Sequence, residues 1–417
     1  MDNSLLKTTA PLRMWTGALV FMVPSLILTT QVGIGLASFL FLFTALWKFG
    51  AGRAALARHW HEVRWVVLAF VFNFVLVLAY FLLRPEQPLN TLEKPLRMFC
   101  AVTATMAVLL ARPPRQALWW GAILGAIGAM FFIGHQRVVL QMERPGGFMN
   151  AITFGDIALT LSMVALVAAL EFRRAGRSVL WPLVGGLAGI LALVMTGTRG
   201  GWIALALAAV LCMRHGHLAR SRNVRLLLGA GVALAAVLYF VPATEIQLRV
   251  QQGIDDVRKW HSGVDKFTNV GIRLELWKAA GMLIAEQPLV GQDPAVAHEK
   301  VVRWVQDGTL SDVALAPQHL HNDALQALAS GGVLGLLALV GILAAPFAFF
   351  ARHARLAIAR GQPPSAPALA GMLVALGYFG FGLTEMMFYS GKSCLFYALM
   401  VFILMGFCLN EKEEFGN

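Results

Sequence analysis

Two histidines, an amide and a carboxylate stand together at the end of the longest polar segment in this sequence. His319, His321, Asn322 and Asp323 run directly into a long apolar stretch. Unperturbed imidazole titrates at about pH 6.5, so it can accept a proton from a hydroxyl at neutral pH. We therefore take His321 as a candidate general base, supported by His319 and Asn322. The alternative is a histidine that only caps the helix at a membrane surface.

Arginines elsewhere are candidates to bind a negatively charged group. Arg199 lies between glycines in the sequence Thr-Gly-Thr-Arg-Gly-Gly-Trp, which interrupts two apolar stretches and lets a ligand approach the backbone closely. Arg273 stands four residues before Trp277, so the two share a face if the segment is helical. A guanidinium near a membrane is costly unless it faces a cavity, a partner or a phosphate, or extends to the aqueous surface. Lys94 and Arg97, beside a proline-rich loop, present the same alternatives.

The elements that must position these side chains are membrane helices. Of the 417 residues, 58% are hydrophobic and only 13% are charged, which is typical of a polytopic membrane protein and unlike a soluble domain. Apolar stretches of about 17 to 25 residues mark transmembrane helices. We therefore predict an all-α bundle of about twelve transmembrane helices, at residues 12–28, 30–47, 64–83, 94–111, 117–135, 152–171, 180–196, 200–213, 225–241, 321–350, 367–388 and 392–409.

Arginine positions predict the orientation of this bundle. Clusters such as Arg112 with Arg115 and Arg173 with Arg174 fall in loops on the side of both termini. By the positive-inside rule, both termini are expected in the cytoplasm and the polar segment outside. This topology accounts for the excess of 34 Lys and Arg over 22 Asp and Glu without a nucleic-acid partner. The first apolar stretch leads directly into another, which favours a retained anchor over a cleaved signal.

The polar segment is predicted to form a small helical element. Apolar residues recur at helical spacing from Ile246 to Trp260 and from Leu274 to Ile284, and a shorter third helix is expected near 297–306. The alternative is a solvated cap that only packs on the bundle. The expected organisation is transmembrane helices 1 to 9 in 1–241, a periplasmic helical loop in 242–320, and helices 10 to 12 with a short cytoplasmic tail in 321–417.

The sequence offers no pattern for a metal or a cofactor. The four cysteines fall in or beside apolar stretches without the spacing of metal ligands, and there is no Asp-x-Asp pair. Outward-facing arginines with a general base suit a phosphate or pyrophosphate substrate, which guanidinium groups bind bidentately. If pyrophosphate leaves from a lipid-linked sugar, the arginines stabilise its charge in place of a divalent cation, and one displacement inverts the anomeric carbon.

Four motifs resemble, in their order, those of the O-antigen ligase and polymerase superfamily, over about residues 145–390. They are Thr-x-Arg-Gly-Gly-Trp around Arg199, Arg273-x-x-x-Trp277 with Pro288-x-x-Gly291, His321-Asn322-x-x-Leu325 with Gly332 and Gly335, and Thr384-Glu385. The resemblance implies a membrane glycosyltransferase of the C type. Within the superfamily the chain is most similar to O-antigen ligases, which transfer O-antigen from undecaprenyl pyrophosphate to the lipid A core without metal or nucleotide.

The resemblance also implies a location and residue roles. The site faces the periplasm at the inner membrane of a Gram-negative bacterium, where membrane lipids surround the chain. His321 matches the proposed base, and Arg199 and Arg273 match arginines that engage the pyrophosphate; Arg249 matches less closely. An O-antigen polymerase and a protein O-oligosaccharyltransferase, which differ in their acceptor, are alternatives. A transporter of lipid-linked glycans is an alternative from a different functional class. Such a protein would be expected to contain internal repeats, and the sequence shows none.

Overall fold

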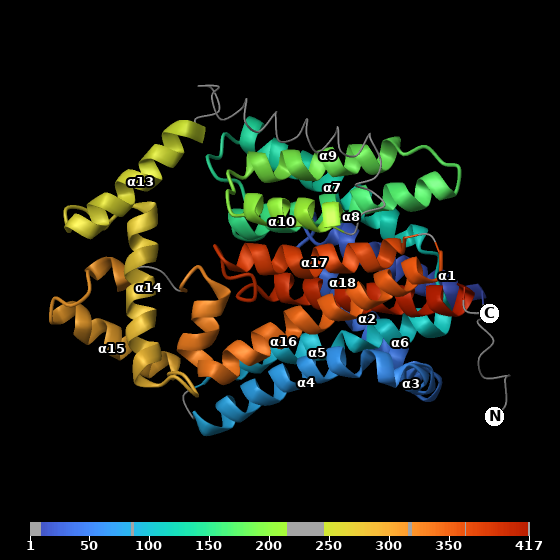
Figure 1. Ribbon diagram of the computed structural model, residues 1–417, viewed down its shortest axis with the longest axis horizontal. Helices are drawn as coiled ribbons and strands as arrows, with labels where there is room; N and C mark the ends of the chain where they lie inside the picture. Colours follow the sequence, from blue (N-terminus) through green and yellow to red (C-terminus); the bar gives the residue numbers. More distant parts are fainter. Residues whose placement is uncertain (1–9, 85–86, 215–245, 316–318, 363, 416–417) are drawn as a thin grey trace. The chain divides into compact units, whose positions relative to one another are not determined.

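The computed structural model describes residues 10–84, 87–214, 246–315, 319–362 and 364–415. Every regular element in these ranges is a helix, which confirms the predicted all-α class for them (Figure 1). Helices bond their own backbone polar groups, so they suit a chain with long apolar stretches. Two compact units divide the chain: unit 1 comprises Met1–Leu205 with Ala338–Asn417, and unit 2 comprises Ala206–Leu337.

Unit 1 is a bundle built around the last helix of the chain. Every residue of that helix from Ser393 to Glu411 is buried, and it packs against α6 and α17, while α8, α9 and α7 form a second layer of neighbours (Figure 1). The helices that lie wholly or partly in this unit are α1 (Ala10–Leu26), α2 (Gly33–Trp47), α3 (Phe49–Arg58), α4 (Trp60–Leu83), α5 (Glu93–Cys100), α6 (Val102–Ala111), α7 (Gln116–Gly134), α8 (Ala151–Arg174), α9 (Leu180–Met195), α10 (Gly201–Arg214), α16 (Asp323–Ala359), α17 (Ala366–Gly382) and α18 (Gly391–Phe415).

Several of these helices can cross a membrane. Among the described residues, six helical segments are long and apolar enough, and the pair α2 and α3, bent by 93°, would make a seventh. The predicted count of about twelve is not confirmed, because α1, α9, α10 and α17 have at most 17 residues each. The expected span at 225–241 lies outside the described residues. The chain is a multi-pass membrane protein whose full set of spans stays a prediction.

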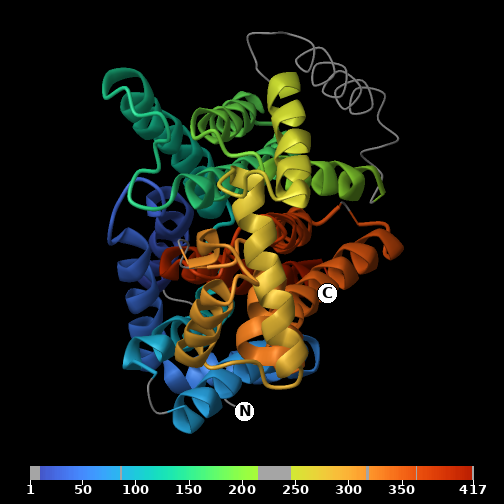
Figure 2. The ribbon, with the colours of Figure 1, turned by 90° about the vertical axis from the view of Figure 1, so that its left-hand side faces the viewer.

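Unit 2 holds the three helices predicted for the polar segment. They are α13 (Ile246–Ser262), α14 (Asn269–Glu286) and α15 (Pro294–Gln306), and Figure 2 shows α14 as the long gold helix. Their starts follow ordinary capping chemistry. The hydroxyl of Thr268 accepts a hydrogen bond from the Gly271 amide, and Asp293 caps α15 directly before Pro294.

A buried carboxylate joins the parts of unit 2. Glu275 of α14 has no exposed surface, and it accepts hydrogen bonds from Trp260 Nε1 at 2.8 Å, from Lys266 Nζ at 3.3 Å and from the Ser311 amide at 2.7 Å. Burial alone would raise the pKa of Glu275, but these three donors outweigh it and hold the pKa below its ordinary value. One side chain therefore connects α13, the loop before α14 and the segment after α15.

Glu275→Gln is expected to destabilise unit 2 by about 2–4 kcal/mol, because a neutral amide replaces the buried charge that accepts three hydrogen bonds and pairs with Lys266. The folded-state pKa lies below the unfolded value, so this stabilisation is present at neutral pH and is lost as the pH falls below 4.5 toward the lowered pKa. Limited proteolysis within 246–315 at several pH values measures it. The variant should be cleaved faster at neutral pH, and its difference from wild type should shrink in acid.

Glu286→Gln on the same helix is the matched control. Glu286 is exposed and pairs with Lys300 at the surface, so the loss is expected to stay under about 1 kcal/mol. Equal cleavage rates for the two variants would contradict the role assigned to Glu275.

Candidate functional site

The loop that carries Arg199 is held firmly within unit 1. It runs from the end of α9 to the start of α10, and Thr196 and Thr198 in it are buried. Their hydroxyl oxygens are 2.8 Å apart, Thr196 Oγ1 donates to the Leu193 carbonyl at 2.7 Å, and Thr198 Oγ1 donates to the Ala151 carbonyl at 3.2 Å. The loop is thereby bonded to both α9 and the first residue of α8.

Two glycines allow other helices to contact this loop closely. A Cβ at Gly155 of α8 would lie 2.6 Å from Thr196 Oγ1 and 2.7 Å from Thr198 Oγ1, and a Cβ at Gly200 would overlap the hydroxyl of Thr384. Two of the sequence motifs, the Arg199 loop and Thr384-Glu385, therefore meet in unit 1. Glu385 itself is buried.

The segment after Thr384 collects two lysines. Lys94 Nζ lies 4.8 Å from the centroid of the Tyr389 ring, a cation–π distance. Lys392 Nζ donates to the Thr30 carbonyl at 3.1 Å and lies 5.3 Å from the centroid of the Phe148 ring. The sequence analysis missed Lys392, although a lone lysine at the start of the last apolar stretch was a signal for it. Arg199, Lys94 and Lys392, with the segment 384–392, are called the Arg199 group below.

Arg97 has a different environment from its neighbour Lys94. Its guanidinium forms an ion pair of 2.7 Å with Glu93, one helical turn earlier in α5, and both side chains are about half exposed. An exposed pair at this spacing is an ordinary feature of a helix surface. The structure therefore places Lys94 beside Tyr389 and Arg97 in a surface pair.

His321 occupies a tightly fixed turn in unit 2. Its φ is +49°, in the left-handed region that few residues other than glycine adopt. The rings of His319 and His321 meet edge to face, with centroids 4.3 Å apart. Asn322 Oδ1 accepts a hydrogen bond of 2.9 Å from the Leu325 amide, so it caps the first turn of α16. The backbone turn points the chain from the histidines into the helix.

Trp277 of α14 fixes the residue before His321. Its Nε1 donates to the Leu320 carbonyl at 3.0 Å, and the Leu320 amide donates to Gln326 Oε1 at 3.3 Å. Arg273 lies one turn earlier in the same helix and is partly buried. Arg273, Trp277 and residues 319–322, called the His321 group below, are thus assembled within unit 2. Arg249 belongs to α13, but its side chain lies outside the described part of the chain.

The structure corrects the prediction of an unbroken helix over 321–350. At Gly332, φ is +59° and ψ is −157°, so α16 consists of a short first part and a long second part. The segment Pro288–Gln292 bonds the backbone groups that the break frees. The Gln292 amide donates to the Ala329 carbonyl at 2.8 Å, and the Val333 amide donates to the Pro288 carbonyl at 2.8 Å. Hydropathy is insensitive to such a break, because both parts are apolar.

Two glycines make this contact possible. Gly291 has φ of +67°, and a Cβ there would overlap the backbone of Gly331, while a Cβ at Gly332 would overlap the backbone of Leu289. The Pro-x-x-Gly and Gly-x-x-Gly motifs are therefore two sides of one backbone-to-backbone contact. It anchors the short part of α16, and hence the turn that carries His321.

Comparisons with known proteins agree with the motifs. Residues 183–340 match a family model described as O-antigen ligase, and this range contains Arg199, Arg273 and His321. The chain is also similar to a protein of Haemophilus influenzae (strain Rd) described as uncharacterized. The two are 22% identical over 305 residues, which cover 70% of this chain and 74% of that protein.

Gly332→Ala is expected to abolish accumulation of folded protein or to lower its unfolding temperature strongly. The φ and ψ values are accessible essentially to glycine alone, and the added methyl group would overlap Leu289. Thermal unfolding of the detergent-purified protein measures this. Gly281→Ala is the control, because Gly281 is an exposed helical glycine with no atom near its Cβ position. It should be neutral or stabilising by about 0.5–1 kcal/mol; comparable losses in both variants would contradict the backbone contact.

Proposed function

The chain belongs to the O-antigen ligase and polymerase superfamily, and on this premise we propose that it transfers O-antigen polysaccharide from undecaprenyl pyrophosphate to the lipid A core. The observation that carries the proposal is the His321 turn, which lies in the matched region and is fixed on one side by Trp277 and on the other by Asn322. An imidazole on a firmly held turn, with its ring against that of His319, suits proton abstraction from an acceptor hydroxyl.

In the proposed reaction, His321 takes the proton from a hydroxyl of the acceptor sugar. The hydroxyl oxygen attacks the anomeric carbon of the donor, and the bond from that carbon to the pyrophosphate oxygen breaks. The electron pair stays with the leaving pyrophosphate, and the anomeric configuration inverts. Arg199 and Arg273 stabilise the charge that develops on the leaving group, with Lys94 in support. No metal takes part in these steps.

Inner-membrane location follows from the family, and the finer topology is part of the proposal. Both termini are cytoplasmic, about twelve helices cross the membrane, and residues 242–320 form a periplasmic loop with the site on that face. The clusters of arginine in the loops between helices support this orientation.

The acceptor distinguishes the proposal from its relatives. A polymerase would extend a second lipid-linked glycan, and a protein O-oligosaccharyltransferase would modify a protein hydroxyl. Purified protein in proteoliposomes, given a lipid-linked O-antigen and rough lipopolysaccharide, should yield a ladder of slower bands on a gel. Product only with a second lipid-linked glycan or with a pilin would assign the chain to one of the alternatives, and transport of the donor without any product would indicate a carrier.

His321→Ala is expected to lower transfer by about two orders of magnitude or more, because general base catalysis typically contributes a factor of 10² to 10⁴. Donor binding should change little. The assay is the reconstituted transfer, run in excess chelator because no metal step is proposed. His298→Ala is the matched control, since His298 is an exposed histidine of α15 in the same unit. Wild-type turnover in the His321 variant would rule out the proposed base.

Arg199→Ala and Arg273→Ala are each expected to weaken donor binding and to slow transfer by about tenfold or more, because each removes a charge-assisted hydrogen-bonding group from the pyrophosphate. Binding of a labelled lipid pyrophosphate to the purified variants and the transfer rate measure the two effects. Arg352→Ala, at an exposed arginine of α16, serves as the control. A variant with unchanged binding and rate would remove that arginine from the site.

A further inference from the structure

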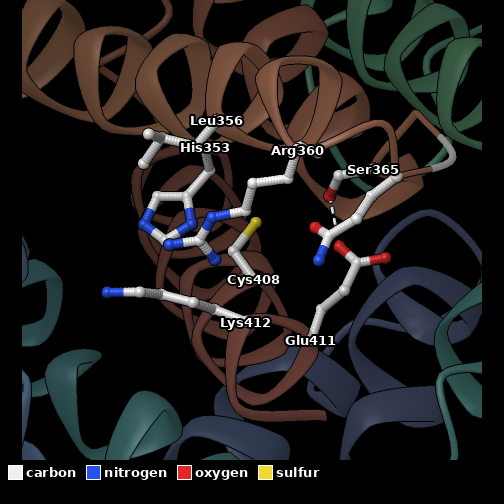
Figure 3. A pocket seen from close by; sticks show the side chains of 9 residues that line it. His353, Leu356, Arg360, Ser365, Cys408, Glu411 and Lys412 are labelled. Carbon is white, nitrogen blue, oxygen red and sulfur yellow. Dashed lines mark hydrogen bonds between the residues drawn. The ribbon is translucent and has the colours of Figure 1, made fainter. Parts of the chain in front are cut away.

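A pocket lies at the end of unit 1 where α16 and α18 finish (Figure 3). None of its lining residues belongs to the Arg199 group, and the proposed reaction makes no use of it. Polar side chains from three segments line it, namely His353 and Arg360 at the end of α16, Ser365 before α17, and Glu411 and Lys412 of α18. Its residues are therefore brought together only by the fold.

Most of the charges in the pocket are compensated by the protein itself. Glu411 accepts a hydrogen bond from Arg115 at 3.0 Å and another from the Ser365 hydroxyl. Lys412 Nζ lies 3.0 Å from a carboxylate oxygen of Glu62. The other oxygen of that carboxylate lies 3.5 Å from His353 Nε2. Glu411 and Glu62 therefore each have a cationic partner in the protein, and the charge of Lys412 is paired with Glu62.

Arg360 is the exception among the lining residues. Its backbone amide bonds to Leu356, but its guanidinium has no hydrogen bond or ion pair with any described residue. Figure 3 shows the guanidinium extended along the pocket toward His353 and Cys408. Arginine stays protonated in proteins, and its planar group matches phosphate geometry. The Arg360 side chain is exposed, so the pocket offers a permanent positive charge to the surroundings of the protein.

The rest of the lining favours an amphiphilic ligand. Leu356 and Ala357 of α16 give the pocket an apolar wall, the buried Cys408 of α18 adds to its apolar lining, and the exposed Ile358 extends apolar surface along α16. A cation beside an apolar wall, at the end of membrane-crossing helices, is where a lipid headgroup meets its glycerol and acyl chains. A small soluble anion would gain nothing from that wall.

We propose that this pocket binds the phosphate group of an anionic phospholipid, with Arg360 as its principal contact and Leu356 and Ala357 against the lipid's glycerol and upper acyl region. The bound lipid would contact the ends of both α16 and α18 and so hold them together. It is a structural lipid site, separate from the donor and acceptor of the proposed transfer reaction.

Retention of phosphatidylglycerol tests the proposal. The full-length protein is placed in nanodiscs of phosphatidylcholine with and without phosphatidylglycerol, and native mass spectrometry measures the anionic lipid that stays bound. Arg360→Gln is expected to reduce retention about fivefold or more, and Arg360→Lys by less, because a lysine keeps the charge but not the bidentate geometry. Arg355→Gln is the matched control, since Arg355 is an exposed arginine of the same helix outside the pocket. Equal retention in wild type and Arg360→Gln, or an equal loss in Arg355→Gln, would overturn the site.

A second measurement separates a lipid headgroup from a free anion. Inorganic phosphate is titrated into the protein in phosphatidylcholine nanodiscs, and the unfolding temperature is followed. A ligand that binds only the folded state raises that temperature, so phosphatidylglycerol should raise it in wild type but not in Arg360→Gln, and inorganic phosphate should not. An Arg360-dependent rise with inorganic phosphate alone would show that the pocket takes a soluble phosphate and would refute the lipid.

Discussion

The constraint on which this structure depends is that backbone groups freed inside a membrane protein must find partners within the protein. α16 breaks at Gly332, and the amides and carbonyls near the break bond to Pro288 and Gln292. The connection between α9 and α10 breaks at the Arg199 loop, where buried threonines bond to carbonyls of α8 and α9. In both places the compensation fixes a segment that carries a candidate functional side chain. Irregular backbone and proposed chemistry coincide because a break held this firmly can position a residue that a regular helix cannot.

Charge is handled in a related way. Glu275 is fully buried, yet three donors from different segments surround it, so it organises unit 2. At the end of α18, carboxylates meet Arg115 and Lys412, and the end of the most deeply buried helix is thereby tied to its neighbours. Buried ions that lack partners cost several kcal/mol, about as much as a domain's whole margin of stability. The guanidinium of Arg360 is exposed and does not bear this cost; it lines the pocket at this end of unit 1, and it is the group with which the proposed lipid phosphate would pair.

The sequence predicted local features better than contacts between residues that are far apart in the chain. The helices in the polar segment and the all-α class follow from periodicity and capping chemistry, which are local properties. The break at Gly332 was missed because its cause lies in the distant segment Pro288–Gln292, and Lys392 was missed because its neighbours, Thr30 and Phe148, are remote in sequence. The ion pair of Arg97 with Glu93 was visible as a spacing of four residues. The number of spans depends on helix lengths and bends that hydropathy does not resolve.

The backbone of His321 shows how these levels combine. A histidine with φ of +49° carries a modest conformational cost, which the protein offsets on both sides, through Trp277 at Leu320 and through the Asn322 cap at the start of α16. The cap in turn belongs to the short part of α16, whose far end is bonded to Gln292. An imidazole in ordinary helical backbone would move with its helix, whereas this one is defined by three separate attachments. Preorganisation of that kind would reduce the reorganisation needed when a base accepts its proton, so these backbone attachments support the proposal that His321 is the base.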